Sequence, residues 1–193
     1  MTVTRSLEGH NAMTSSTGPQ AKAPELPGRF DFQGQEVRWA AIGDGSGRPL
    51  VLVHGTPFSS AVWRRIAPLL ARDRKVFYFD LLGYGQSEMR EGQDVSLNIQ
   101  GRMFAALLDH WNLRQPDVAA HDFGGATALR AHLLHGCDYN SLTLVDAVAI
   151  SPWGSPFVQH VKAHEAAFSG LPPYIHAALL DAYIQGAAHR PLS

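Results

Sequence analysis

The sequence has one cysteine, almost no net charge and no long apolar run, and each shortage excludes a class of protein. A single cysteine, Cys137, excludes an internal disulfide framework and a multi-cysteine zinc site, and it fits a reducing compartment. Sixteen Lys and Arg against seventeen Asp and Glu give a net charge of -1, which provides no electrostatic basis for binding nucleic acid or anionic lipid. The longest apolar runs have the length of strands, so we expect no membrane span. The N-terminal residues lack the apolar stretch of a secretory signal, and we expect a cytoplasmic protein.

What the chain does have is enough apolar material for a core. Of its 193 residues, 45% are hydrophobic and 17% are charged, which is typical of a globular protein. Residues 1–28 are rich in Ser, Thr, Gly and Pro without periodicity, and we expect a flexible tail there. Residues 29–150 have the pattern of a folded core. Residues 151–193 begin with Gly/Pro breaks and continue with two helix-like stretches, 158–168 and 174–184, which predict part of a helical cap or lid.

The core pattern alternates strands with helices. Apolar and polar residues alternate on both sides of Gly34, which predicts two half-buried antiparallel strands. Apolar residues with helical spacing follow Ser59, Ser96 and Gly124. Four continuous apolar runs predict parallel strands buried on both faces: 50–53, 76–79, 118–120 and 142–145. We therefore predict an α/β fold with a mostly parallel, doubly wound sheet, with catalytic groups at the carboxyl ends of the strands.

The turn after the third of these strands carries the strongest functional signal. Residues 120–125 read A-H-D-F-G-G and lie between a predicted strand and a predicted helix. Small residues around one reactive side chain at such a turn are typical of a nucleophile elbow, and here that side chain is Asp122. An aspartate at a helix N-terminus is also favoured by capping and by the helix dipole, without any catalysis.

The turn after the first of these strands supports the catalytic interpretation. It reads His54-Gly55-Thr56-Pro57, and a glycine followed by a backbone N–H that can face the elbow is what an oxyanion hole needs. The two donors would be the amides of Thr56 and Phe123. We expect His54 to be a packed, hydrogen-bonded histidine and not a proton-transfer group. A further turn, F-D-L-L-G-Y-G-Q-S at 79–87, is weaker evidence by itself.

Together these turns resemble the α/β-hydrolase superfamily over residues 30–192, and most closely its epoxide hydrolase and haloalkane dehalogenase branch. In that branch an aspartate attacks a saturated carbon, and a histidine-activated water then hydrolyses the alkyl ester, with no cofactor. The resemblance implies that Asp122 is the nucleophile, that Thr56 and Phe123 supply the oxyanion hole, and that the substrate is a small apolar organic molecule. An aspartate is ordinarily ionised at neutral pH and needs no base for this attack, which disfavours serine esterase chemistry.

The resemblance leaves the leaving group open. The H-D-x-G-G run is similar to those of epoxide hydrolases and haloacetate dehalogenases. Haloalkane dehalogenases typically hold the halide with a tryptophan after the nucleophile and often an asparagine after His-Gly, where this chain has Phe123 and Thr56. Epoxide hydrolases take acid groups from lid tyrosines, which makes Tyr174 and Tyr183, beside Trp153, candidate substrate contacts, although such side chains often only pack the lid.

The acid and the histidine of a catalytic triad have weaker sequence signals than the nucleophile. Asp146 follows the fourth parallel strand and is either the acid of the triad or the cap of a turn. No histidine follows a further strand, so we expect the sheet to be incomplete at the C-terminus and the chain to be a fragment of a longer hydrolase. His160 and His164 have the spacing of metal ligands on a helix, but without a third ligand we expect no metal site. A non-catalytic, hydrolase-like binding protein is the rival class.

Overall fold

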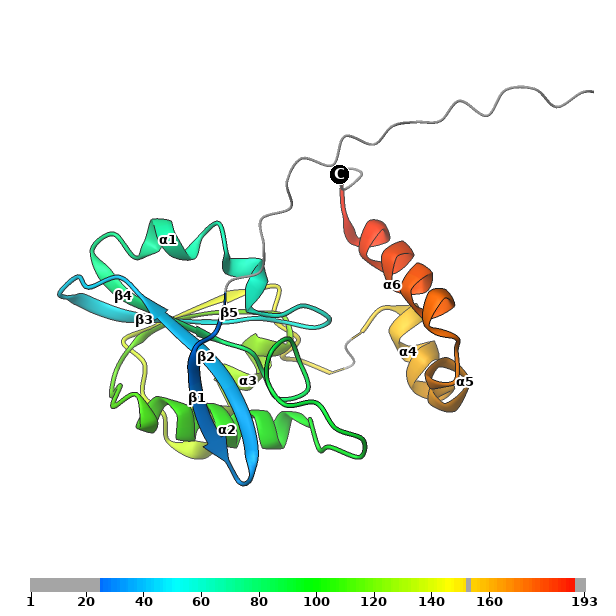
Figure 1. The fold of residues 1–193 in the computed structure, drawn as a ribbon, viewed down its shortest axis with the longest axis horizontal. Helices are drawn as coiled ribbons and strands as arrows, with labels where there is room; N and C mark the ends of the chain where they lie inside the picture. The colour runs from blue at the N-terminus through cyan, green and yellow to red at the C-terminus, as the bar shows by residue number, and fades with distance from the viewer. Residues whose placement is uncertain (1–24, 152–153, 190–193) are drawn as a thin grey trace, which may run out of the picture. The chain divides into compact units, whose positions relative to one another are not determined.

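The computed structural model describes residues 25–151 and 154–189 (Figure 1). Of these residues, 25–151 and 154–163 form the larger of two compact units by contacts within the chain, and 164–189 lie in the other. Each unit is described by itself. Most of the predicted tail, 1–28, and the candidate lid residue Trp153 lie outside the described residues.

The larger unit is built on one six-stranded sheet in the order β1-β2-β4-β3-β5-β6. The first two strands are antiparallel to their neighbours and the remaining pairs are parallel, as the alternating and continuous apolar patterns predict. The strands are β1 (Gly28–Phe32), β2 (Gln35–Ile42), β3 (Gly47–Val53), β4 (Arg74–Phe79), β5 (Asp117–His121) and β6 (Ser141–Val145).

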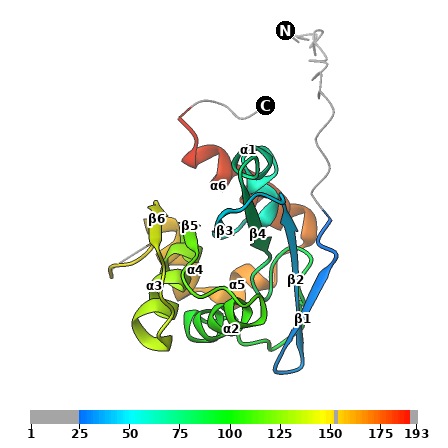
Figure 2. The same ribbon diagram turned by 90° about the vertical axis from the view of Figure 1, so that its left-hand side faces the viewer.

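Helices cover both faces of this sheet. Helices α2 (Leu97–His110) and α3 (Phe123–His135) lie on one face, and the short elements η1 (Ser60–Trp63) and α1 (Ala67–Leu70) lie on the other (Figures 1 and 2). The single helix predicted after Ser59 is wrong. Pro68 lies in the first turn of α1, where a residue without a backbone N–H is tolerated. In one continuous helix from residue 60, Pro68 would lie in the interior and disrupt it, so the segment forms two short helical pieces.

Two apolar clusters fill the spaces on either side of the sheet and confirm the doubly wound architecture. The larger lies under α2 and α3 and includes the stacked rings of Phe79 and Phe104, 5.6 Å apart. The smaller lies under η1 and α1 and includes Leu26 and Tyr78. Leu26 is fully buried and β1 starts at Gly28, so the ordered body begins before the predicted boundary at residue 29.

The face beyond β6 remains open within the described residues. Leu133 and Leu134, two of the apolar residues with helical spacing that follow Gly124, lie on α3 and are 71% and 59% exposed. Leu144 and Val145 of the edge strand β6 are 41% and 48% exposed. Helical spacing identifies an apolar face but does not tell whether another element covers it.

The final segment is helical, as predicted. It contains α4 (Pro156–Ala163), α5 (Glu165–Ser169) and α6 (Pro173–Ala187), and none of the three buries a side chain. The predicted helix 158–168 is interrupted at His164, whose backbone leaves the helical region at φ -131°. Residue contacts group α4 with the larger unit, whereas the sequence predicts a boundary at residue 150. Within the described ranges no helix is both long and apolar enough to cross a membrane.

Candidate active site

Asp122 lies at a strained turn between β5 and α3. Its backbone adopts φ 50° and ψ -120°, a region that non-glycine residues rarely occupy and that costs about 1–3 kcal/mol. Four backbone hydrogen bonds hold it there: its N–H donates to the Val145 carbonyl at 3.0 Å, and its carbonyl accepts from Gly125 at 2.9 Å, Val148 at 3.3 Å and Ala126 at 3.4 Å. This is the strand–turn–helix geometry of a nucleophile elbow, which projects the side chain from the carboxyl end of the sheet.

Two glycines let neighbouring backbone approach the elbow. A Cβ on Gly55 would lie 2.5 Å from the Asp122 Cβ and 2.6 Å from its Oδ2. A Cβ on Gly124 would lie 2.3 Å from the His54 carbonyl oxygen. Real Cβ contacts are never this short, so the close packing of α3 and the His54–Thr56 turn against the elbow requires both glycines.

The Thr56 amide contacts the Asp122 carboxylate directly. Its N–H donates to Oδ2 at 2.7 Å, the short distance expected of a charge-assisted hydrogen bond. Oδ1 accepts no hydrogen bond from any residue that the structure describes. The second predicted donor, Phe123, is the first residue of α3, where helices leave their N–H groups without intrahelical partners. One carboxylate oxygen is thus held and the other is available.

His54 is a packed, hydrogen-bonded histidine, as the sequence predicts. It is completely buried. The Leu81 N–H donates to its Nε2 at 3.0 Å, so the ring proton is on Nδ1, which donates to the Gly55 carbonyl at 3.0 Å. Burial lowers the pKa of His54 and outweighs the carboxylates of Asp80, whose Oδ1 is 3.9 Å from Nε2, and of Asp122. His54 therefore joins the His54–Thr56 turn to the turn after β4 and carries no charge.

Tyr84 is a site residue that the sequence analysis did not identify. Its hydroxyl lies 2.8 Å from Thr56 Oγ1, and its ring contacts those of His54 and Phe123 at centroid distances of 5.5 and 6.4 Å. Burial raises the pKa of Tyr84, and the nearby Asp122 carboxylate raises it further. The only sequence signal was its place in the G-Y-G turn at the carboxyl end of β4.

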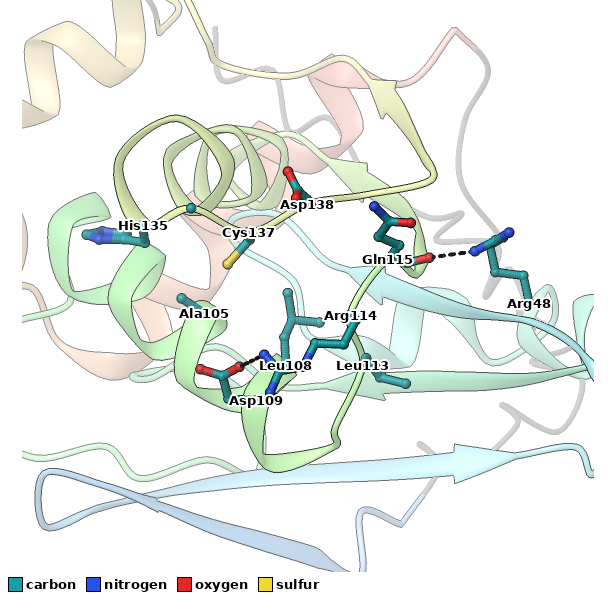
Figure 3. A pocket seen from close by; sticks show the side chains of 11 residues that line it. Arg48, Ala105, Leu108, Asp109, Leu113, Arg114, Gln115, His135, Cys137 and Asp138 are labelled. Carbon is teal, nitrogen blue, oxygen red and sulfur yellow. Dashed lines mark hydrogen bonds and ion pairs between the residues drawn. The ribbon is translucent and has the colours of Figure 1, made fainter.

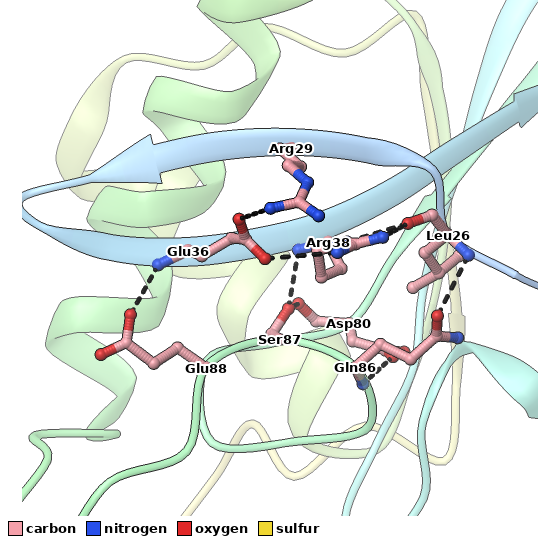
Figure 4. A network of polar contacts seen from close by, with 8 residues as sticks. All are labelled: Leu26, Arg29, Glu36, Arg38, Asp80, Gln86, Ser87 and Glu88. Carbon is pink, nitrogen blue, oxygen red and sulfur yellow. Dashed lines mark hydrogen bonds and ion pairs between the residues drawn. The ribbon is translucent and has the colours of Figure 1, made fainter.

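A buried polar network holds the turn that carries Tyr84 (Figure 4). Asp80 is 1% exposed, and its two carboxylate oxygens accept from the amides of Ser60 and Gln86, both at 2.7 Å. Ser87 Oγ donates to the Asp80 carbonyl at 2.6 Å and accepts from the Arg38 amide of β2 at 2.9 Å. The turn is therefore tied to the sheet and to η1 through satisfied hydrogen bonds, which fixes the position of the phenol.

The structure gives no contact between Asp122 and the other predicted site residues that it describes, Asp146, Tyr174 and Tyr183. Asp146 directly follows β6, beside the end of β5, where Val145 pairs in register with His121, and its side chain is exposed. Tyr174 and Tyr183 lie on α6 in the other unit and are 73% and 36% exposed. No group of three or more His, Cys, Asp or Glu side chains suited to a metal ion occurs among the described residues.

A hollow of about 600 Å³ lies at the amino end of the strands, away from the Asp122 elbow (Figure 3). Its arginines already have partners: Arg48 donates to the Gln115 carbonyl at 3.2 Å, and Arg114 pairs with Asp109 at 3.0 Å. Burial, with help from neighbouring carboxylates, raises the pKa of the Cys137 thiol there to about 11. This cysteine is therefore a thiol at neutral pH, and the hollow contains no activated nucleophile.

The chain is similar in sequence to several known proteins. The chain is 34% identical to the "Dihydrolipoyllysine-residue acetyltransferase component of acetoin cleaving system" of Pseudomonas putida, over 68% of this chain and 35% of that protein. It is also 34% identical to a "Fluoroacetate dehalogenase" of Burkholderia sp, over 61% of this chain and 42% of that protein. These matches span about two fifths of the relatives' lengths.

A solved structure is more similar still. The crystal structure of an alpha/beta hydrolase fold protein from Burkholderia ambifaria is 60% identical to the chain, with a TM-score of 0.84, over 89% of this chain and 62% of that one. Residues 48–172 match the family model described as "alpha/beta hydrolase fold". The chain therefore belongs to the alpha/beta hydrolase family.

Proposed function

We propose that this chain carries the nucleophile of a hydrolase that opens epoxides, with Asp122 attacking a saturated carbon. The observation that supports this best is the Asp122 carboxylate at a positive-φ elbow, with Oδ2 held by the Thr56 amide and Oδ1 available for attack. A carboxylate is ordinarily ionised at neutral pH and can attack without a base, whereas a serine at this position would need one.

The first half-reaction forms an alkyl ester. Asp122 Oδ1 bonds to an epoxide carbon, the ring C–O bond breaks, and its electron pair stays on the ring oxygen, which takes up a proton. Water then attacks the ester carbonyl and releases a diol. The amides of Thr56 and Phe123 are the proposed donors for the oxyanion of that second step, and Asp146 is the proposed acid that orients a histidine base.

A dehalogenase is the second candidate, supported by the 34% identity to the fluoroacetate dehalogenase. The same Asp122 oxygen would attack the halogen-bearing carbon, and the halide would leave as an anion. Phe123 and Thr56 provide no indole or amide side-chain N–H for a departing halide, so we rank this reaction second.

Trapping the ester tests the proposal. The purified chain is incubated with styrene oxide or with 1-bromobutane, and the intact mass and the mass of the Asp122 peptide are measured. We expect one added substrate on Asp122 in the wild type, none in D122N, and an unchanged addition in D146N, a matched strand-end carboxylate. A chain that is folded by circular dichroism but is modified by neither reagent would contradict an Asp122 nucleophile.

A further inference from the structure

The hydroxyls of Thr56 and Tyr84 form a pair beside the candidate nucleophile. Thr56 contacts Asp122 through its amide, at 2.7 Å from Oδ2, and Tyr84 through its side chain, at 2.8 Å between the two hydroxyl oxygens. One residue therefore connects a tyrosine of the β4 turn to the carboxylate of the β5 turn. All three residues belong to the larger unit, unlike the lid tyrosines.

The chemistry of the two hydroxyls sets the direction of this hydrogen bond. A phenol is a far stronger acid than an aliphatic alcohol, so the stronger bond is the one in which Tyr84 donates to Thr56 Oγ1. Burial raises the pKa of Tyr84 by more than the hydrogen bond with Thr56 lowers it, and the Asp122 charge raises it further, so the phenol keeps its proton at neutral pH. The Thr56 hydroxyl then has its own proton free to donate, and Thr56 is exposed to solvent.

Contacts with neighbouring residues hold Thr56 and Tyr84 in place. The Tyr84 ring is held between His54 and Phe123, and the turn that carries it is fixed by the Asp80 network of Figure 4. His54 also fixes the Gly55 carbonyl, and with it the peptide that carries the Thr56 amide. A donor held in place before the reaction costs little reorganisation when charge develops.

We propose that Thr56 and Tyr84 form an acid relay that protonates the leaving oxygen when Asp122 opens an epoxide; this inference rests on the proposed function. As the ring C–O bond breaks, the alkoxide takes the proton of the Thr56 hydroxyl, and Thr56 takes the phenolic proton of Tyr84. The Tyr84 phenolate then recovers a proton from water. A departing halide is a stable anion that needs no proton, so the relay favours epoxides as the substrate class.

Three variants test the relay: Y84F, T56V and the double variant, with T56S retaining the hydroxyl. The rate of Asp122 alkylation is followed by mass for styrene oxide and for 1-bromobutane. We expect Y84F and T56V each to slow epoxide addition by about 10²-fold, the order of general acid catalysis, and the double variant to be no slower than either. T56S, which keeps the hydroxyl, is expected to recover most of the rate that T56V loses, and each variant is expected to slow bromide displacement much less than epoxide addition.

The control is Y78F, which removes the hydroxyl of another buried tyrosine, on β4, and is expected to change neither rate. Equal slowing with both reagents would mean that Tyr84 is only structural, and unchanged rates would exclude it from the reaction; both overturn the relay. A wild type modified by bromobutane but not by styrene oxide overturns the relay and leaves Asp122 as a nucleophile. A folded wild type modified by neither reagent overturns the proposed function itself.

Discussion

Replacing Gly55 with alanine should push the His54–Thr56 turn away from Asp122. The added Cβ would lie 2.5 Å from the Asp122 Cβ, 2.6 Å from its Oδ2 and 2.9 Å from the His121 carbonyl oxygen. Favourable carbon contacts are about 3.5–4.0 Å, so the overlap with the Asp122 Cβ is about 1 Å. That atom cannot rotate away, because it is attached to a backbone held by hydrogen bonds to Val145, Gly125 and Val148.

The clash should cost both stability and reactivity. Overpacking of this kind typically destabilises a protein by about 1–3 kcal/mol. With a urea m-value of about 2 kcal/mol per molar, the unfolding midpoint should fall by about 0.5–1.5 M. A displacement of about 1 Å between Asp122 and the Thr56 turn should slow alkylation by about 10²-fold, because productive attack depends on fixed geometry.

Tryptophan fluorescence in urea measures the first effect, since Trp39, Trp63 and Trp111 all lie in the larger unit. The mass of the Asp122 peptide over time measures the second. G186A is the matched control, because a Cβ on Gly186 of α6 meets nothing within 4 Å. A G55A chain with the wild-type midpoint and alkylation rate would refute the close approach of Gly55 and Asp122.

Two further predictions concern buried titratable groups. Burial lowers the pKa of His54 in the folded chain, so below about pH 6.5 the unfolded chain binds a proton at His54 that the folded chain does not. The free energy of unfolding should therefore fall as the pH drops below about 6.5, by at most about 1.4 kcal/mol per pH unit. H54N, which keeps a donor for the Gly55 carbonyl but does not titrate, should give a flatter pH profile in urea titrations; parallel profiles would contradict a neutral His54. Cys137, with a thiol pKa of about 11, should have about one thiolate in 10⁴ molecules at pH 7 and should react with iodoacetamide much faster in urea than when folded. Equal labelling rates measured by mass in both conditions would contradict its burial.

The elbow and the sheet could be predicted because their signals are local. Apolar runs mark each buried strand, and Gly124 and Gly125 follow Asp122 within three positions of the sequence. Tyr84 could not be found in this way, because it meets Thr56 across 28 positions and nothing about a tyrosine in a turn indicates its partner. The interruption near Pro68 could have been predicted from the proline alone, but the apolar spacing around it favoured one helix.

The strained turn at Asp122 persists because four separate segments restrain it. Its amide is bonded to β6, its carbonyl to α3 and to the segment after β6, and its carboxylate to the Thr56 turn, which His54 joins in turn to the residues after β4. The turn could release this strain of about 1–3 kcal/mol only by shifting its backbone. Its tightly packed neighbours would have to shift with it, so the strained conformation is retained. The aspartate that is proposed to react is therefore held in place before any substrate binds, and Thr56 and His54 connect it to the turn that carries the Tyr84 phenol.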